Sequence, residues 1–169
     1  MEKAPIKRST YVVTLSRDHH SGLLFCWKIK EGIKRDISFE RLNNYIRYFW
    51  EGHLNKHFQE EEILLFNQIR HELTEQALME HVQLKDLFLR ISSSGLDHKE
   101  DYLFFTEFLT AHIRFEERRL FPFLESALSE ALLSGIRDIL AKLHEPQFKD
   151  DYPDEFWLQH KDKPHTGSE

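Results

Sequence analysis

The sequence predicts an all-α protein: an antiparallel up-down-up-down four-helix bundle followed by a short C-terminal helix and a tail. Three observations predict this fold class. Four long segments carry apolar residues at helical spacing, and turn formers are scarce, with only 6 Gly and 5 Pro among 169 residues. No segment shows the alternation of apolar and polar residues that is typical of strands. Short polar links between the four segments favour consecutive helices that pack as antiparallel neighbours.

The first two helices are predicted from their apolar periodicity and their end signals. The first covers residues 15–31 and is expected to stop before Gly32, because glycine commonly follows a helix. The second starts after Ser38, a residue type that caps helix N-termini. Its apolar positions continue at helical spacing to Arg70, which predicts a long helix.

The third predicted helix covers residues 74–92 and is ended by a run of three serines and Gly95. Asp97 and Glu100 resemble a capping box at the start of the fourth, whose apolar run extends over residues 103–128. Pro122 lies inside that run and is expected to kink or interrupt the helix. A shorter fifth helix is predicted over residues 129–143.

We therefore expect one bundle domain over residues 1–145 and an irregular tail over residues 146–169. The tail contains prolines and many charges, with no helical periodicity. Its aromatic residues are expected to pack in part on the bundle rather than to bind another protein: Phe148, Tyr152, Phe156 and Trp157.

Composition and charge exclude several classes of function. The net charge of -6 and the absence of a Lys/Arg stripe argue against a nucleic-acid partner. Cys26 is the single cysteine, which excludes an internal disulfide and any cysteine-based zinc or iron-sulfur site within this chain. No apolar run reaches the roughly 20 residues of a membrane span, and the N-terminus lacks a signal-peptide stretch. We expect a soluble cytoplasmic protein without a membrane partner.

Two predicted helices carry the same His/Glu motif. His57 precedes Glu61 by four residues and His112 precedes Glu116 by four residues, which places each pair on one helical face, one turn apart. The flanks agree as well, since HFQEEEILLF and HIRFEERRLF match at five of ten positions. In the expected bundle these two helices are parallel, so the repeat predicts a pseudo-symmetric site across the bundle axis.

The other two long helices each add histidine at a comparable depth. His19 and His20 follow Asp18 in the first helix, and His81 follows Glu80 in the third. Four imidazoles and two carboxylates with no thiolate suit borderline divalent metals such as iron. A carboxylate shared between two ions would also offset their mutual repulsion. The pattern therefore predicts a site for two metal ions.

The order His, His-x-x-x-Glu-Glu, His, His-x-x-x-Glu-Glu-x-x-Leu-Phe-Pro resembles the hemerythrin family, in particular its HHE cation-binding branch, over residues 11–128. The resemblance implies a non-haem di-iron centre with two iron ions, or another divalent cation. It implies binding or sensing of oxygen, another small diatomic ligand or iron itself, and so a metal-binding protein rather than an enzyme. It makes Glu61 and Glu116 bridging ligands and makes His57, His81 and His112 terminal ligands.

The resemblance takes one further ligand from His19 and His20, and the preceding leucine and acid favour His19. Lys85, one turn after His81, stands where oxygen-carrying members place another histidine. Either a metal position stays open there, or His53, one turn before His57, supplies the ligand. An open position favours sensing or redox chemistry, so a di-iron oxidase or peroxidase is the alternative.

The remaining acidic and imidazole groups receive supporting or solvent-exposed positions. Glu62 and Glu117 lie about 100 degrees round the helix from the motif glutamates and are expected to form ion pairs or to support the ligands. Five histidines at helix ends or in the tail are expected to be exposed, with no metal role: His71, His98, His144, His160 and His165.

Overall fold

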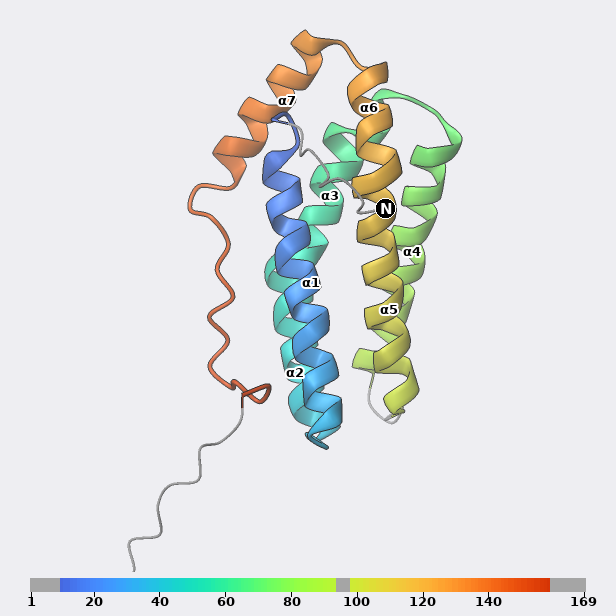
Figure 1. Ribbon diagram of the computed structural model, residues 1–169. Helices are drawn as coiled ribbons and strands as arrows, with labels where there is room; N and C mark the ends of the chain where they lie inside the picture. The colour runs from blue at the N-terminus through green and yellow to red at the C-terminus, as the bar shows by residue number, and fades with distance from the viewer. Residues whose placement is uncertain (1–9, 94–97, 159–169) are drawn as a thin grey trace, which may run out of the picture.

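The computed structural model describes residues 10–93 and 98–158, and all regular structure in these ranges is helical, which confirms the all-α class. The elements are α1 (Val13–Lys34), α2 (Phe39–Phe49), η1 (Trp50–Leu54), α3 (Asn55–Leu64), η2 (Phe66–Gln68), α4 (Glu72–Ser92), α5 (Lys99–Phe115), η3 (Glu116–Leu120), α6 (Phe121–Ala127) and α7 (Glu130–Leu143). Four columns lie side by side: α1, α2 to α3, α4, and α5 to α6 (Figure 1). Helix α7 lies at one end of these columns (Figure 1).

Serine side chains cap two of the helices. The Ser38 hydroxyl accepts a hydrogen bond from the backbone N–H of Arg41, which confirms the predicted start of α2. Ser129 caps α7 in the same way, accepting from the N–H of Leu132 at 3.2 Å. Each cap satisfies an N–H group that has no partner inside its helix.

Helix α4 begins two residues earlier than predicted. His71 precedes it, and His71 Nδ1 accepts a hydrogen bond from the N–H of Leu73 at 3.1 Å. The Thr74 hydroxyl in turn accepts from the N–H of His71 at 3.0 Å, so that the two residues form a capping box. His71 is therefore a half-buried cap rather than an exposed side chain. Asp97, of the capping box expected before α5, lies outside the described residues.

Helix α1 does not stop before Gly32 but continues to Lys34. A Cβ atom at Gly32 would lie 2.5 Å from Leu42 Cδ2 and 2.8 Å from the ring of Phe156. Both distances are shorter than any ordinary contact, so the glycine is required by close packing of α2 and the tail against α1. The prediction of a helix end at this glycine is therefore wrong.

The second and fourth predicted helices each contain one π-helical turn, η1 and η3, between α-helical segments. Pro122 does not break the fourth column. It lies in the first turn of α6, immediately after η3, where a missing N–H is tolerated. The column therefore continues past the proline, and α5 and α6 lie in line (Figure 1).

Two apolar clusters fill the interior of the bundle, one toward each end. One contains Phe25, Phe49, Leu84 and Phe105, and the other contains Leu15, Leu65, Ala77 and Leu124, each with its neighbours. On each of the four columns, the histidine and glutamate residues predicted as ligands fall between residues of one cluster and residues of the other. The bundle thus holds a polar layer between two hydrophobic layers.

The chain after α7 runs back along the bundle beside α1 and α2 (Figure 1). Phe156 and Trp157 are buried in the first apolar cluster. Asp150 accepts a hydrogen bond from Lys28 Nζ at 2.8 Å, and Asp154 forms a two-point contact with the guanidinium of Arg41. The described part of the tail, to residue 158, is therefore fixed to the bundle by both aromatic packing and ion pairs.

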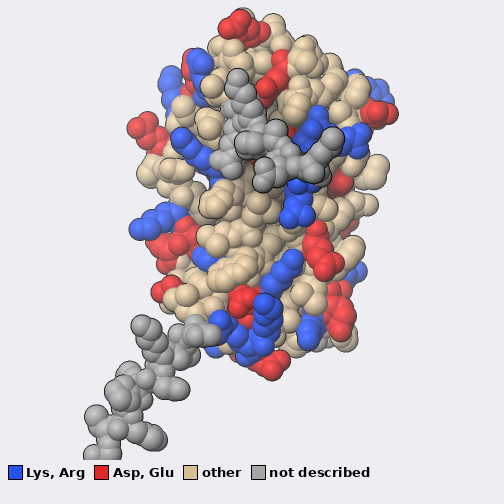
Figure 2. Space-filling view, viewed as in Figure 1, with Lys and Arg blue, Asp and Glu red and all other residues tan. Residues whose placement is uncertain are grey.

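On the face shown in Figure 2, basic and acidic side chains lie interspersed rather than gathered by sign. Within the described ranges, no helix is both long enough and apolar enough to cross a membrane.

Candidate metal centre

Six side chains from four columns meet in the polar layer. His19 comes from α1, His57 and Glu61 from α3, His81 from α4, His112 from α5, and Glu116 from η3. All six are buried, and the two glutamates have no exposed surface. His57 and Glu61 face the bundle interior together, as do His112 and Glu116, because residues four apart on a helix lie on the same face.

The Glu61 carboxylate lies between two groups of imidazoles. Its Oε1 is 2.8 Å from His57 Nε2 and 3.2 Å from His19 Nε2, whereas its Oε2 is 3.3 Å from His81 Nε2. One oxygen therefore faces the His19 and His57 side, and the other oxygen faces the opposite side.

The Glu116 carboxylate repeats this arrangement from the other side of the bundle. Its Oε1 is 3.1 Å from His112 Nε2 and 3.6 Å from His81 Nε2, and its Oε2 is 2.9 Å from His19 Nε2. The six residues thus form two groups of four that share both glutamates: His19, His57, Glu61, Glu116 and Glu61, His81, His112, Glu116.

Several buried polar atoms in this layer lack the partners that a metal-free protein would require. Glu61 Oε2 and both carboxylate oxygens of Glu116 have no hydrogen-bond partner with acceptable geometry. His81 Nε2 and His112 Nε2 approach each other to 3.1 Å, although both face the carboxylates. Buried carboxylates are costly unless a cation or a set of donors compensates them. The donor set, of nitrogen and carboxylate oxygen without thiolate, fits two divalent cations.

The outer nitrogen of each imidazole donates to a carboxylate. His57 Nδ1 donates to Asp18 at 3.0 Å, and His112 Nδ1 donates to Glu80 at 2.7 Å. When these imidazoles are neutral, the donations from Nδ1 select the tautomer in which Nε2 carries a lone pair that faces inward, as metal-binding histidines require.

The other two imidazoles are oriented in the same way. His19 Nδ1 donates to Glu117 at 2.7 Å, and His81 Nδ1 donates to Glu62 at 2.8 Å. Glu62 and Glu117 therefore occupy the supporting positions expected of them. The matching roles of Asp18 and Glu80 were not predicted, although each directly precedes a predicted ligand in the sequence.

The electrostatics of the layer couple these groups strongly. Burial acts to lower the pKa of His57, but Glu61 and Asp18 outweigh it and raise that pKa to about 9. Burial and the neighbouring Glu116 act to raise the pKa of Glu61, yet the imidazoles of His57 and His19 hold it below its ordinary value. The two carboxylates therefore stay ionised and attract positive charge, which protons or metal ions can supply.

The structure does not bring every candidate residue into the layer. His20 and Lys85 are exposed, so neither joins the two groups, and among the pair in α1 only His19 does. His53 is buried but lies outside both groups, with its ring stacked on Phe148 at a centroid distance of 4.0 Å. Among the described residues, each of the two groups thus contains two imidazoles and the same two carboxylates.

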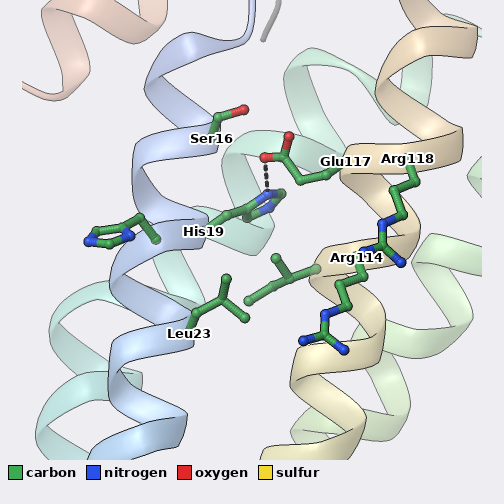
Figure 3. A pocket seen from close by; sticks show the side chains of 8 residues that line it. Ser16, His19, Leu23, Arg114, Glu117 and Arg118 are labelled. Atoms are coloured by element: carbon green, nitrogen blue, oxygen red, sulfur yellow. Dashed lines mark hydrogen bonds and ion pairs between the residues drawn. The ribbon is translucent and has the colours of Figure 1, made fainter. Parts of the chain in front are cut away.

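A cavity of about 340 Å³ reaches the layer from outside, between α1 and the column of α5 and η3 (Figure 3). His19 and Glu117 line it and are joined there by their hydrogen bond, while Arg114 and Arg118 extend from the facing column (Figure 3). Small molecules in this cavity would contact the ring of one candidate ligand. The carboxylates of Glu61 and Glu116 remain fully buried.

Two of the remaining histidines differ from the exposed position expected of them. His71 caps α4, as described above, and His144 is half-buried at the end of α7, where it contacts Glu60. His98 is exposed, as expected, whereas His160 and His165 lie outside the described residues.

Comparison with known proteins agrees with this geometry. No curated protein and no solved structure matches the chain. The family model for the hemerythrin HHE cation-binding domain matches residues 14–124, which include all six side chains of the polar layer and more than half of the sequence. The chain belongs to the hemerythrin HHE cation-binding domain family, and its buried His/Glu groups are those of a metal-binding protein.

Proposed function

We propose that this protein holds a non-haem di-iron centre in the polar layer and uses it to bind or sense oxygen, another small diatomic ligand, or iron supply. One observation carries the proposal. Glu61 and Glu116 each direct one oxygen to the His19 and His57 side and the other oxygen toward His81 or His112. A carboxylate in that position can neutralise two cations at once.

The residues divide into holding and orienting roles. His19 and His57 would hold one ion, His81 and His112 the other, and the two glutamates both ions. The outer carboxylates keep each imidazole in the tautomer that binds metal. Iron in such a site supplies reversible redox chemistry. The apolar clusters on both sides of the layer keep bulk water away from it.

We assign the antiparallel up-down-up-down order to the bundle that carries this site. The links that join α1 to α2, η2 to α4, and α4 to α5 are short in sequence, which favours antiparallel neighbours. In this order the two repeated columns are parallel, so their histidines and glutamates face each other at one depth.

The test is anaerobic loading of the full chain with ferrous ion, followed by metal analysis and exposure to air. We expect two iron ions per chain and a new absorption in the near-ultraviolet and visible range after exposure. Without a new absorption, the oxygen-binding version is lost and iron sensing remains. A folded protein that retains no metal contradicts both versions.

A di-iron oxidase or peroxidase is the second candidate, favoured by the small number of ligands. Lys85 is exposed and no fifth imidazole joins the described groups, so each ion would keep positions open to small molecules. Turnover of hydrogen peroxide by the iron-loaded protein, lost in a Glu116→Gln variant, would support the enzyme. Binding of oxygen without turnover would support the sensor.

A further inference from the structure

A second group of buried polar side chains lies beside the polar layer. Asp18 of α1, Glu60 of α3 and His144, which follows the last residue of α7, each offer a ligand atom, and these atoms lie within 4.8 Å of one another. Their side chains are only 7%, 7% and 11% exposed. Three segments far apart in the sequence therefore bring ionisable groups into one buried place.

Two buried atoms at this group, Glu60 Oε1 and His53 Nε2, have no hydrogen-bond partner. His144 Nε2 lies 2.5 Å from Glu60 Oε2, but His144 Nδ1 is 3.7 Å from Asp18 Oδ1, too far for a hydrogen bond. His53 Nε2 is also 3.7 Å from Asp18 Oδ1 and has no hydrogen-bond partner, although His53 is 5% exposed. Glu60 Oε1 likewise has no hydrogen-bond partner, and Lys56 Nζ approaches it only to 3.6 Å.

These atoms surround a common space. Asp18, His53, Glu60 and His144 all line one cavity of about 170 Å³, which Phe148 of the tail also lines. The end of a helix favours positive charge, and His144 stands directly after the end of α7. Buried carboxylate oxygens without a hydrogen-bond partner also occur in the polar layer described above, at Glu61 and Glu116.

We propose that Asp18, Glu60 and His144 form a third cation site, for a single divalent transition-metal ion, and that His53, which lies outside this group of three but lines the same cavity, completes it as a fourth ligand. Two imidazoles and two carboxylates without thiolate suit borderline ions such as Zn²⁺, Fe²⁺ and Co²⁺. The proposal rests on these four residues and does not depend on the function proposed for the two-metal layer.

Occupation of this site is coupled to the two-metal layer through Asp18. Its Oδ2 accepts the hydrogen bond from His57 Nδ1 at 3.0 Å, while its Oδ1 faces the third site. A cation on Oδ1 draws charge away from Oδ2 and weakens the support of the His57 ligand. The same cation fixes the end of α7 and the start of the tail to α1 and α3.

The direct test replaces His144 by cysteine and titrates the full chain with Co²⁺. A thiolate that binds Co²⁺ produces charge-transfer absorption in the near-ultraviolet, which the other ligands do not, so His144→Cys is expected to show it. The native Cys26 does not interfere, because burial raises its pKa to about 12. His98→Cys, at an exposed position, is the matched control and is expected to show no such band.

A second cysteine variant approaches the same site from another helix. Glu60→Cys on α3 is expected to give the same absorption, so the test does not depend on how well one variant folds. If both variants are saturated with Co²⁺ at the two-metal layer and neither shows the band, the third site is overturned.

Metal content gives an independent measurement. The wild-type chain is expected to bind three Co²⁺ ions and Glu60→Gln two, whereas equal contents in both overturn the proposal. If the polar layer binds no metal, the outcome is different: His144→Cys would still give the charge-transfer band, with one Co²⁺ ion per chain. Glu116→Gln in the His144→Cys background is expected to show that pattern as well.

Discussion

The carboxylates that accept from the imidazole Nδ1 atoms offer a test of the proposed two-metal centre, because Glu62 and Glu80 differ in exposure. Glu80 accepts from His112 Nδ1 at 2.7 Å with its side chain 16% exposed, and Glu62 accepts from His81 Nδ1 at 2.8 Å with its side chain 37% exposed. Glu80 also accepts a hydrogen bond from Gln76 Nε2 at 3.2 Å. Substitution by glutamine keeps an acceptor at each position but removes the charge that makes the imidazole a stronger metal ligand.

The expected loss of metal affinity follows from these positions. Removal of such a partner typically lowers affinity by about 10- to 100-fold, or roughly 1.4 to 2.8 kcal/mol. Solvent screens Glu62 more than Glu80, so we expect Glu80→Gln near the upper end of that range and Glu62→Gln near the lower end.

The assay is competition for Zn²⁺ or Fe²⁺ between the protein and a chromophoric chelator, under anaerobic conditions for iron. Glu107→Gln, at an exposed position on α5, is the matched control and is expected to bind metal like the wild type. If Glu80→Gln retains the affinity of this control, or if Glu62→Gln loses more than Glu80→Gln, the orienting role of these carboxylates is refuted.

Three further predictions concern stability. At a free metal concentration of about 100 times Kd, each bound ion adds about 2.7 kcal/mol, so removal of the two ions of the proposed centre by a chelator should lower Tm by roughly 11 to 22 °C; an unchanged Tm would contradict metal binding. Gly32→Ala should destabilise the fold by about 1 to 3 kcal/mol in urea unfolding because its Cβ meets Leu42 and Phe156, whereas Gly135→Ala, with open space around it, should stabilise α7 by about 0.5 to 1 kcal/mol. Because the pKa of His57 is raised from 6.5 to about 9, its contribution to metal-free stability is present below pH 6.5 and lost as pH rises through 9. Metal affinity should rise over the same interval as protons are displaced, and calorimetry in buffers of different ionisation enthalpy should detect proton release; its absence would contradict this coupling.

Local signals were sufficient to predict the helices and the inward-facing groups. Residues four apart on a helix share a face whatever the tertiary structure, so His57 and Glu61 could be placed together from sequence, as could His112 and Glu116. The preceding leucine and acid favoured His19 over His20, and the rotation of α1 about its own axis, which the neighbouring helices determine, places His19 inside and His20 outside.

Features that depend on distant contacts were not accessible in this way. Gly32 looked like a helix end, because nothing near it in the sequence indicates that Phe156 packs on it. His144 looked like an exposed residue at a helix end, because its contacts with Asp18 and Glu60 arise only when α7 folds back onto the bundle. The predictions for both residues were wrong for the same reason. The contacts that bury them involve the tail and the last helix, which are distant in the sequence from their partners.

The repeated motif also explains more of the layer than its ligands. Each copy supplies a histidine, an inward glutamate, a second glutamate and a phenylalanine, and the last two serve a histidine of another column. In the first copy, Glu62 accepts from His81, and the ring of Phe66 lies 5.6 Å from that imidazole.

In the second copy, Glu117 accepts from His19, and the ring of Phe121 stacks on that imidazole at 5.3 Å. The helices that carry His19 and His81 in turn orient the motif histidines, since Asp18 accepts from His57 and Glu80 accepts from His112. Each copy thus places its histidine in one group of four, its inward glutamate in both groups, and its second glutamate beside a histidine of the other group. Damage to one copy should therefore weaken both metal positions, which is why we expect the two ions to be lost together rather than one at a time.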